Sequence, residues 1–127
     1  MGEGENKQVV RRAFDAWAAG EGGVFDLLAP DARWTIVGNS VVAGTYHSRE
    51  EFLASVIRPF NARMATPLVP VVHGLYADGD TVIAYFDASA TVRDGAPYSN
   101  TSTWYLRMRE GGVIVEAVAF WARVEPA

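Results

Sequence analysis

The sequence of 127 residues contains no cysteine and only two histidines. The absence of cysteine excludes disulfide bonds, thiolate nucleophiles and cysteine-ligated metal sites, and it fits a cytoplasmic location. His47 and His73 lie far apart in the sequence, whereas a metal site usually needs three or four clustered ligands. We therefore expect neither a metal nor any other cofactor.

Basic runs and long apolar runs are also missing. The chain has 11 Lys and Arg against 15 Asp and Glu, a net charge of −4, and no more than two basic residues stand together, as at Arg11-Arg12. This balance argues against nucleic acid and acidic membranes as partners. No window holds 18 consecutive apolar residues and Met1–Asn6 is polar, so we expect no membrane span and no signal peptide. What is present, 50% hydrophobic and 12% aromatic residues, fits one domain, 1–127, with a sizeable core.

The first half of the chain predicts helices. Apolar residues recur at three- and four-residue steps up to Ala18, and glycines from Gly20 onward end that pattern. Ser48 and Glu51 form a capping-box pattern, in which each side chain satisfies a free backbone amide, and Pro59 ends or kinks the helix that follows. The expected elements are helices at 9–18, 24–29 and 49–58 and a strand at 33–37.

The second half predicts a meander of antiparallel strands. Its turn signals are Asp78-Gly79, Asp94-Gly95 and Gly111-Gly112, each between β-rich segments. If each is a two-residue loop, residues at equal distances before and after the turn lie opposite each other on the two strands. One face then carries two adjacent rows, Val72–Tyr85–Trp104–Ala119 and Pro70–Asp87–Ser102–Trp121.

The arithmetic puts Asp87, the carboxylate within VIAYFDASATV, on the same face as Asn100 and Tyr98. The opposite face receives His73 and further apolar residues: Val82, Ala84, Phe86, Val118 and Phe120. Helices can cover only one face of the sheet, and a large exposed apolar surface usually marks an interface. We therefore expect a homodimer through the outer sheet face.

Helices followed by a curled meander resemble the NTF2-like superfamily and its SnoaL-like, ketosteroid isomerase-related branch. The resemblance rests on the stretches VVRRAFDAWAAGE, LLAPDARWTIVG, GTYHSREEF, YADGDTVIA and YLRMREGGVIVEAVAFW, which span nearly the whole chain in the family's order. It implies an α+β cone-shaped half-barrel, with three helices from the N-terminal half packed on a curled antiparallel sheet. It also implies a deep pocket between helices and sheet, and commonly a homodimer.

The resemblance implies less about activity, because the family includes both isomerases and non-catalytic binders. Ketosteroid isomerase relatives carry a base on the first long strand, a tyrosine on the first helix and an aspartic acid in the sheet. The corresponding positions here are Thr35–Val37, Ala13 and Trp104. Limonene-epoxide hydrolase relatives place an aspartate where Asp87 stands, but their last-strand acid, which SnoaL-type cyclases share, corresponds to Ala119.

Three hypotheses follow, of which the third is a purely structural or partner-recruiting dimer whose pocket is filled by Trp104 and Trp121. In the first, the chain is a cofactor-independent acid/base enzyme acting on a small hydrophobic molecule, in which Asp87 moves a proton and Tyr85 polarises the substrate. Burial in an apolar pocket would then raise the pKa of Asp87. In the second, the pocket binds an apolar molecule without catalysis, and Asp87 is a structural hydrogen-bond acceptor. The residues expected to contact the small molecule are Trp17, Trp34, Ile36, Tyr46, Phe60, Tyr98, Asn100, Ser102, Trp104, Ala119 and Trp121.

Overall fold

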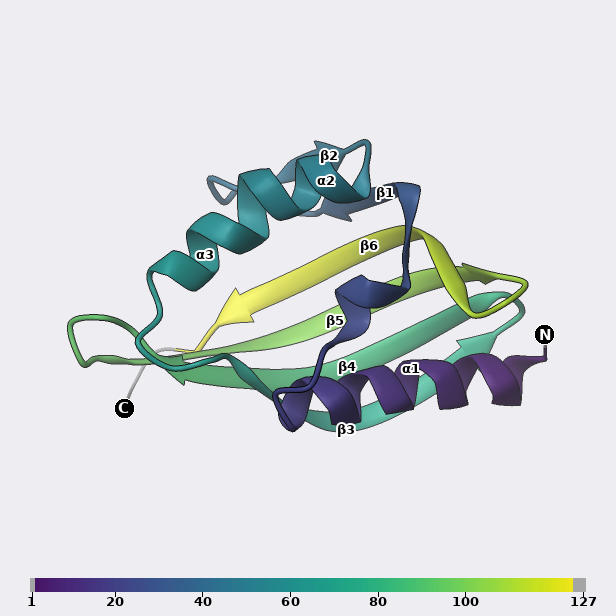
Figure 1. Ribbon diagram of the computed structural model, residues 1–127, viewed down its shortest axis with the longest axis horizontal. Helices are drawn as coiled ribbons and strands as arrows, with labels where there is room; N and C mark the ends of the chain where they lie inside the picture. The colour runs from purple at the N-terminus through teal and green to yellow at the C-terminus, as the bar shows by residue number, and fades with distance from the viewer. Residues whose placement is uncertain (1, 125–127) are drawn as a thin grey trace.

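A curled, mixed sheet of six strands forms the body of the computed structural model, which describes residues 2–124 (Figure 1). The strand order is β2-β1-β6-β5-β4-β3, and all neighbours are antiparallel except β1 and β6. The strands are β1 Leu28–Ile36, β2 Gly44–Tyr46, β3 Val69–Asp78, β4 Thr81–Thr91, β5 Pro97–Arg109 and β6 Val113–Arg123. The expected meander is therefore β3 to β6, extended by the parallel addition of β1.

Two helical segments cover one face of this sheet (Figure 1). They are α1 (Glu3–Ala18) and a continuous run of α2 (Arg49–Phe52), η2 (Leu53–Ile57) and α3 (Arg58–Ala62). The helix expected at 24–29 is wrong: a single 3₁₀ turn, η1 (Val24–Leu27), leads directly into β1. Short helices are marginal on their own, and Leu28 instead pairs with Ile114 of β6.

The second helical segment begins where the sequence predicts. Ser48 caps α2, because its hydroxyl accepts a hydrogen bond of 3.0 Å from the backbone N–H of Glu51. Pro59, in contrast, does not end the segment. A π-helical turn, η2, precedes it, and α3 continues to Ala62. Proline lacks the N–H that an ordinary helical turn uses, and the wider turn accommodates that loss.

The core lies between the helices and the face of the sheet that they cover, here called the inner face. Phe14 of α1 and Phe52 of α2 are almost fully buried against it. From the sheet, Val82, Phe86 and Leu106 are 0–1% exposed. Each large apolar side chain buried in this way contributes about 1.5–3 kcal/mol to stability.

The expected register is right for the β5–β6 hairpin and wrong for the other two. Between β3 and β4, Val72 pairs with Phe86 rather than Tyr85, because a bulge interrupts β3 between Val72 and Gly74. Between β5 and β6, Trp104 pairs with Ala119 and Ser102 with Trp121, as predicted. Between β4 and β5, Thr91 pairs with Pro97, so the connection is a five-residue loop, 92–96, rather than the two residues Asp94-Gly95. Asp94 stabilises this loop by accepting a hydrogen bond from the backbone N–H of Ala96 at 2.9 Å.

The longer loop exchanges the two faces of β4. Since side chains alternate along a strand, a shift of one residue moves each of them to the opposite side. Phe86 pairs with Ser102 on the inner face, and Asp87 pairs with Thr101 on the outer face. The observed inner rows are Leu75–Ala84–Trp104–Ala119 and Val72–Phe86–Ser102–Trp121. The expectation that Val82, Ala84 and Phe86 lie outside was therefore wrong.

Candidate functional site

An aromatic cluster fills the middle of the space between helices and sheet. Its members are Phe14, Trp17, Phe25, Trp34, Phe52, Phe86 and Trp104. The Trp104 indole is at its centre, 4.7 Å from the Phe86 ring, 5.0 Å from Trp34 and 6.0 Å from Trp17 between ring centroids. Trp104 is 8% exposed. The resemblance to ketosteroid isomerases implies an aspartic acid at the position of Trp104. This tryptophan instead packs against the surrounding rings.

Other residues expected to contact a ligand take part in this packing. Trp34, Ile36 and Ala119 are 2–6% exposed. Tyr46 is half-buried, and its hydroxyl donates to the backbone carbonyl of Val42 at 2.7 Å. Trp17 donates its indole N–H to the carbonyl of Leu68 at 2.7 Å, which holds the α3–β3 connection against α1. Their buried surfaces and polar atoms take part in internal packing and hydrogen bonds. Their contact with a ligand stays a prediction.

The inner face becomes polar toward the start of β5. There the hydroxyl of Ser102 donates to Asn100 Oδ1 at 3.0 Å, and Asn100 Nδ2 donates to the hydroxyl of Tyr98 at 3.1 Å. Ser102 and Asn100 are only 5% and 8% exposed. Their placement on one face with Tyr98 confirms the expectation from the sequence, and the three residues are called the polar end below.

Aromatic and cationic groups surround the polar end. The ring of Phe60, on α3, meets the ring of Tyr98 edge to face at 5.4 Å. The guanidinium carbon of Arg123 lies 5.7 Å from the Tyr98 ring centroid. Trp121 neighbours Ser102 across the β5–β6 ladder and remains 37% exposed. The polar end therefore combines hydrogen-bonding atoms with apolar surface that solvent can reach.

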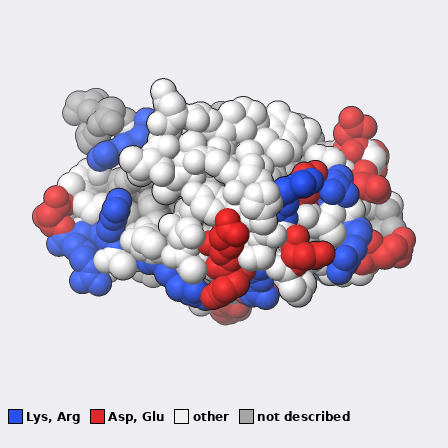
Figure 2. Space-filling model, turned by 90° about the horizontal axis from the view of Figure 1, so that it is seen from above, with Lys and Arg blue, Asp and Glu red and all other residues white. Residues whose placement is uncertain are grey.

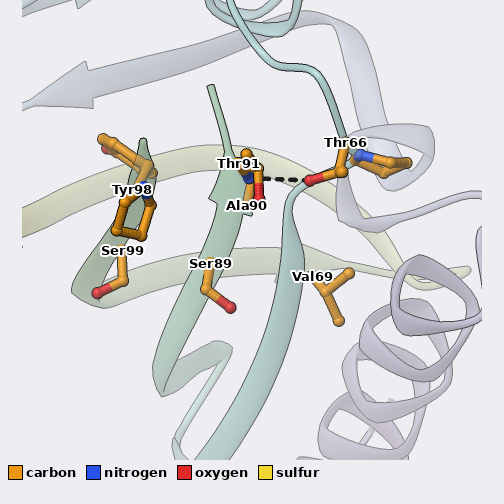
Figure 3. A pocket seen from close by; sticks show the side chains of 9 residues that line it. Thr66, Val69, Ser89, Ala90, Thr91, Tyr98 and Ser99 are labelled. Carbon is orange, nitrogen blue, oxygen red and sulfur yellow. Dashed lines mark hydrogen bonds between the residues drawn. The ribbon is translucent and has the colours of Figure 1, made fainter. Parts of the chain in front are cut away.

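A cavity of about 420 Å³ lies beside Tyr98 at this end of the sheet, and the row Val69–Ser89–Ser99 in its lining belongs to the outer face, next to Asp87 (Figure 3). It lies where β3 begins and the connection from α3 crosses β4. There the backbone N–H of Thr91 donates to the hydroxyl of Thr66 at 2.9 Å. The cavity is lined by Thr66, Pro67, Val69, Ser89, Ala90, Thr91, Pro97, Tyr98 and Ser99. Its wall carries hydroxyls and apolar groups but no charged side chain.

Asp87 and Tyr85 lie on the outer face, away from the aromatic cluster. Asp87 accepts a hydrogen bond from the Thr101 hydroxyl at 2.7 Å, and its other oxygen is 3.0 Å from His73 Nε2. These contacts, that of Thr101 first, lower the pKa of Asp87, and its side chain is 47% exposed. The expectation of a buried carboxylate with a raised pKa was therefore wrong. The proton-transfer role of Asp87 and Tyr85 stays a prediction.

Ionisable acids and imidazoles are absent from the inner side of β4, β5 and β6 within residues 2–124. The register assigns to it only aliphatic, aromatic, Ser and Asn side chains, with Met108 and Arg123 at the two ends. The described residues also contain no group of three or more His, Asp or Glu side chains placed to hold a metal. The inner face can therefore bind and orient a molecule with hydrogen bonds, whereas it offers no carboxylate as a base.

The charged surface shows no basic stripe on the face drawn in Figure 2. Lys and Arg side chains are interspersed there with Asp and Glu near both ends and the lower border, and the upper middle carries neither. Among the ion pairs of the described residues, Arg33 and Arg107 both contact Glu116, at 2.6 and 3.2 Å. Across the part of the chain that the structure describes, no helix is long and apolar enough to cross a membrane.

Sequence reasoning missed Phe86, Phe25 and Phe52 as members of the aromatic cluster. For Phe86 a signal was present in β4 itself. Val82, Ala84, Phe86 and Ala88 form one alternating set, and it is entirely apolar. The other set contains Tyr85 and Asp87. Polarity of alternate residues thus indicates the buried face more directly than turn arithmetic does.

These features belong to a known family. The family model of the SnoaL-like domain matches residues 10–117, most of the chain. The chain therefore belongs to the SnoaL-like domain family, and the resemblance seen in its sequence motifs is confirmed. A comparison with curated proteins finds no match.

Solved structures share the fold. An NTF2-like protein from Burkholderia thailandensis is 25% identical, with a TM-score of 0.72 over 92% of this chain and 90% of that one. IdmH of Streptomyces antibioticus, a candidate polyketide cyclase, is 23% identical, with a TM-score of 0.72 over 92% and 91%. AclR of Streptomyces galilaeus, a candidate hydroxylase, is 17% identical, with a TM-score of 0.74 over 97% and 91%. The NTF2-like architecture is thus shared by proteins given different activities.

Proposed function

We propose that this SnoaL-like protein binds a small, largely apolar molecule carrying a polar group, and that the polar end is its binding site. The observation that carries the proposal is the buried hydrogen-bonded chain Ser102–Asn100–Tyr98 beside aromatic surface. Buried polar groups in an otherwise apolar face orient a ligand and give it specificity. The cavity of about 420 Å³ beside Tyr98 lies at the same end of the sheet, but its row Val69–Ser89–Ser99 faces outward, so it flanks the polar end rather than forming its interior.

Binding without carboxylate chemistry is the function that the inner face supports best. The inner rows of the sheet contain no acid or imidazole among the described residues, and Trp104 occupies the centre. Polyketide cyclase activity, by analogy with IdmH, is the alternative. It would need a proton carrier at the polar end, where the groups that can donate or accept a hydrogen bond are hydroxyls, an amide and Arg123.

Nuclear magnetic resonance titration with ethylbenzene and acetophenone tests this proposal. We expect amide shifts to concentrate at Tyr98, Asn100 and Phe60, with millimolar or tighter binding, because aromatic and hydrogen-bonding surface meet there. Asp87→Asn is the matched control, since it changes a carboxylate on the outer face of the neighbouring strand and leaves the polar end unaltered. Shifts confined to the outer face, or no binding of either compound, would contradict the proposal.

The same variant tests the acid/base hypothesis. If Asp87 moves a proton in a reaction, Asp87→Asn abolishes turnover of the natural substrate while binding persists. If the protein is a binder, Asp87→Asn leaves the titration unchanged.

We also propose that the outer face pairs two copies of the chain as a homodimer. Val71 is 60% exposed there, Phe120 44%, Tyr85 42% and Tyr105 40%. These side chains lie on adjacent strands, and contiguous exposed apolar surface favours association. The location of His73 on this face agrees with the sequence-based expectation, and its interfacial role is part of the proposal.

A further inference from the structure

The hydrogen bonds at the polar end run in one direction. Ser102 donates to the oxygen of the Asn100 amide, and the nitrogen of that amide donates to the oxygen of Tyr98. The amide thereby presents its N–H₂ group, a donor only, to the tyrosine. The Tyr98 oxygen therefore accepts a hydrogen bond in this series, and the proton of the Tyr98 hydroxyl is directed elsewhere.

The hydroxyl proton of Tyr98 lies at the end of this series of hydrogen bonds. No acceptor for it is found within residues 2–124, because the contact made by this hydroxyl there is the one it accepts from Asn100. Hydrogen bonds in series polarise one another, so a phenol that accepts a hydrogen bond becomes a stronger donor.

We propose that Tyr98 makes the polar end selective for ligands that present a hydrogen-bond acceptor, a carbonyl or carboxylate oxygen, and that it disfavours ligands offering only donors. This inference rests on the proposed binding function and adds the chemistry of the ligand's polar group. Asn100 and Ser102 are positioning residues, because they set the direction of the tyrosine proton without needing to touch the ligand.

Three compounds of nearly the same shape test the selectivity. Acetophenone carries an acceptor, ethylbenzene carries no polar group, and 1-phenylethylammonium carries only donors. We expect acetophenone to bind roughly tenfold more tightly than ethylbenzene, the ratio that one well-formed hydrogen bond gives, and the ammonium compound to bind most weakly. Dissociation constants come from the same titration monitored at Tyr98 and Phe60.

Two variants separate hydrogen bonding from packing. Tyr98→Phe keeps the ring against Phe60 and should reduce the acetophenone-to-ethylbenzene ratio to about one. Asn100→Asp, measured at pH 8 to keep the new carboxylate ionised, keeps the tyrosine but replaces its donor neighbour by an acceptor. Tyr98 should then donate to Asp, and the ratio should again fall to about one. Thr101→Val, on the outer face of the same strand, should leave the ratio unchanged.

The outcomes distinguish this inference from the proposed function. Equal binding of acetophenone and ethylbenzene by the unaltered protein would overturn the selectivity while leaving the binding function in place. Tighter binding of the ammonium compound would show that the chain runs in the reverse direction and would also overturn it. A ratio preserved in Tyr98→Phe would assign Tyr98 to packing alone, and a ratio preserved in Asn100→Asp would show that Asn100 does not direct the tyrosine proton; either result would overturn the inference. Absence of binding by all three compounds would instead refute the proposed function.

Discussion

The two faces of β5 differ in almost every physical property although they alternate residue by residue. Trp104 on the inner face is 8% exposed and touches a group of aromatic rings, whereas its neighbour Tyr105 on the outer face is 40% exposed. Asn100 and Ser102 on the inner face bond to neutral partners. Thr101 on the outer face bonds to the carboxylate of Asp87.

This difference shows how one strand can serve two purposes. Polar groups on the inner face are sheltered from water, and an unpaired charge in such a place would destabilise the fold. Neutral groups that hydrogen-bond to one another can be buried there at a lower desolvation penalty. Outer-face groups are hydrated, so a carboxylate such as Asp87, in contact with His73 and Thr101, is tolerated there, and such exposed contacts contribute little to stability. The proposed recognition of a small molecule would use the first environment, and the proposed contact with a second copy of the chain would use the second.

Replacing adjacent aromatic residues on the two faces should give the largest contrast. Trp104→Ala removes the centre of the aromatic cluster and should lower the free energy of unfolding by about 3–5 kcal/mol. Tyr105→Ala, its matched control, should cost less than about 1 kcal/mol in dilute solution, because that side chain is already exposed. Urea unfolding measures both values. Similar losses in the two variants would mean that the faces do not differ in packing as described.

A charge placed on the outer face should have an intermediate effect. Phe120→Arg puts a guanidinium among apolar side chains and should weaken self-association by at least about tenfold, or about 1.4 kcal/mol. Gln8→Arg adds the same charge on the exposed surface of α1 and should leave association unchanged. Sedimentation equilibrium over a range of concentrations measures the dissociation constant. A monomeric unaltered protein, or equal behaviour of the two variants, would refute the homodimer.

The smallest expected effect concerns acid stability. Since Thr101 and His73 lower the pKa of Asp87 in the folded state, the ionised carboxylate stabilises the protein above its ordinary pKa of 3.8. That contribution is lost as the pH falls through the folded-state pKa. The free energy of unfolding of Asp87→Asn should therefore lie below that of the unaltered protein by less than about 1 kcal/mol at pH 7, because the group is exposed. Urea titrations from pH 7 to pH 2.5 should show the gap closing, and a gap independent of pH would contradict the assignment.

Much of the fold was predictable because its signals are local. The amphipathic pattern of α1, the Ser48 cap and the strand-turn alternation of the second half each depend on a few neighbouring residues. The motifs of the family extended these signals to the whole architecture. The parallel pairing of Leu28 with Ile114 is not local, and it converted part of an expected helix into strand.

The candidate site was predicted less well, because the face on which each residue of β4 lies depends on the number of residues in the β4–β5 loop. The polar end was identified correctly, since the β5–β6 register fixes which residues of β5 share a face with Trp104. Asp87 was assigned to the wrong face because the side chain of Asp94 stabilises a loop longer than the Asp-Gly pair suggests. Turn chemistry of this kind is decided by hydrogen bonds that the sequence does not specify uniquely.

The β4–β5 connection also has a meaning for how such proteins diverge. Its five residues form a solvent-exposed segment, where insertions and deletions are readily accepted. Val82, Ala84, Phe86 and Ala88 are buried on one side of β4, so turning this strand over would expose them and bury Asp87. Loss or gain of one codon in the loop should therefore be absorbed by the loop itself, with the faces of β4 unchanged. The apolar side of β4 thus protects the interior of the protein against variation in the length of a neighbouring loop.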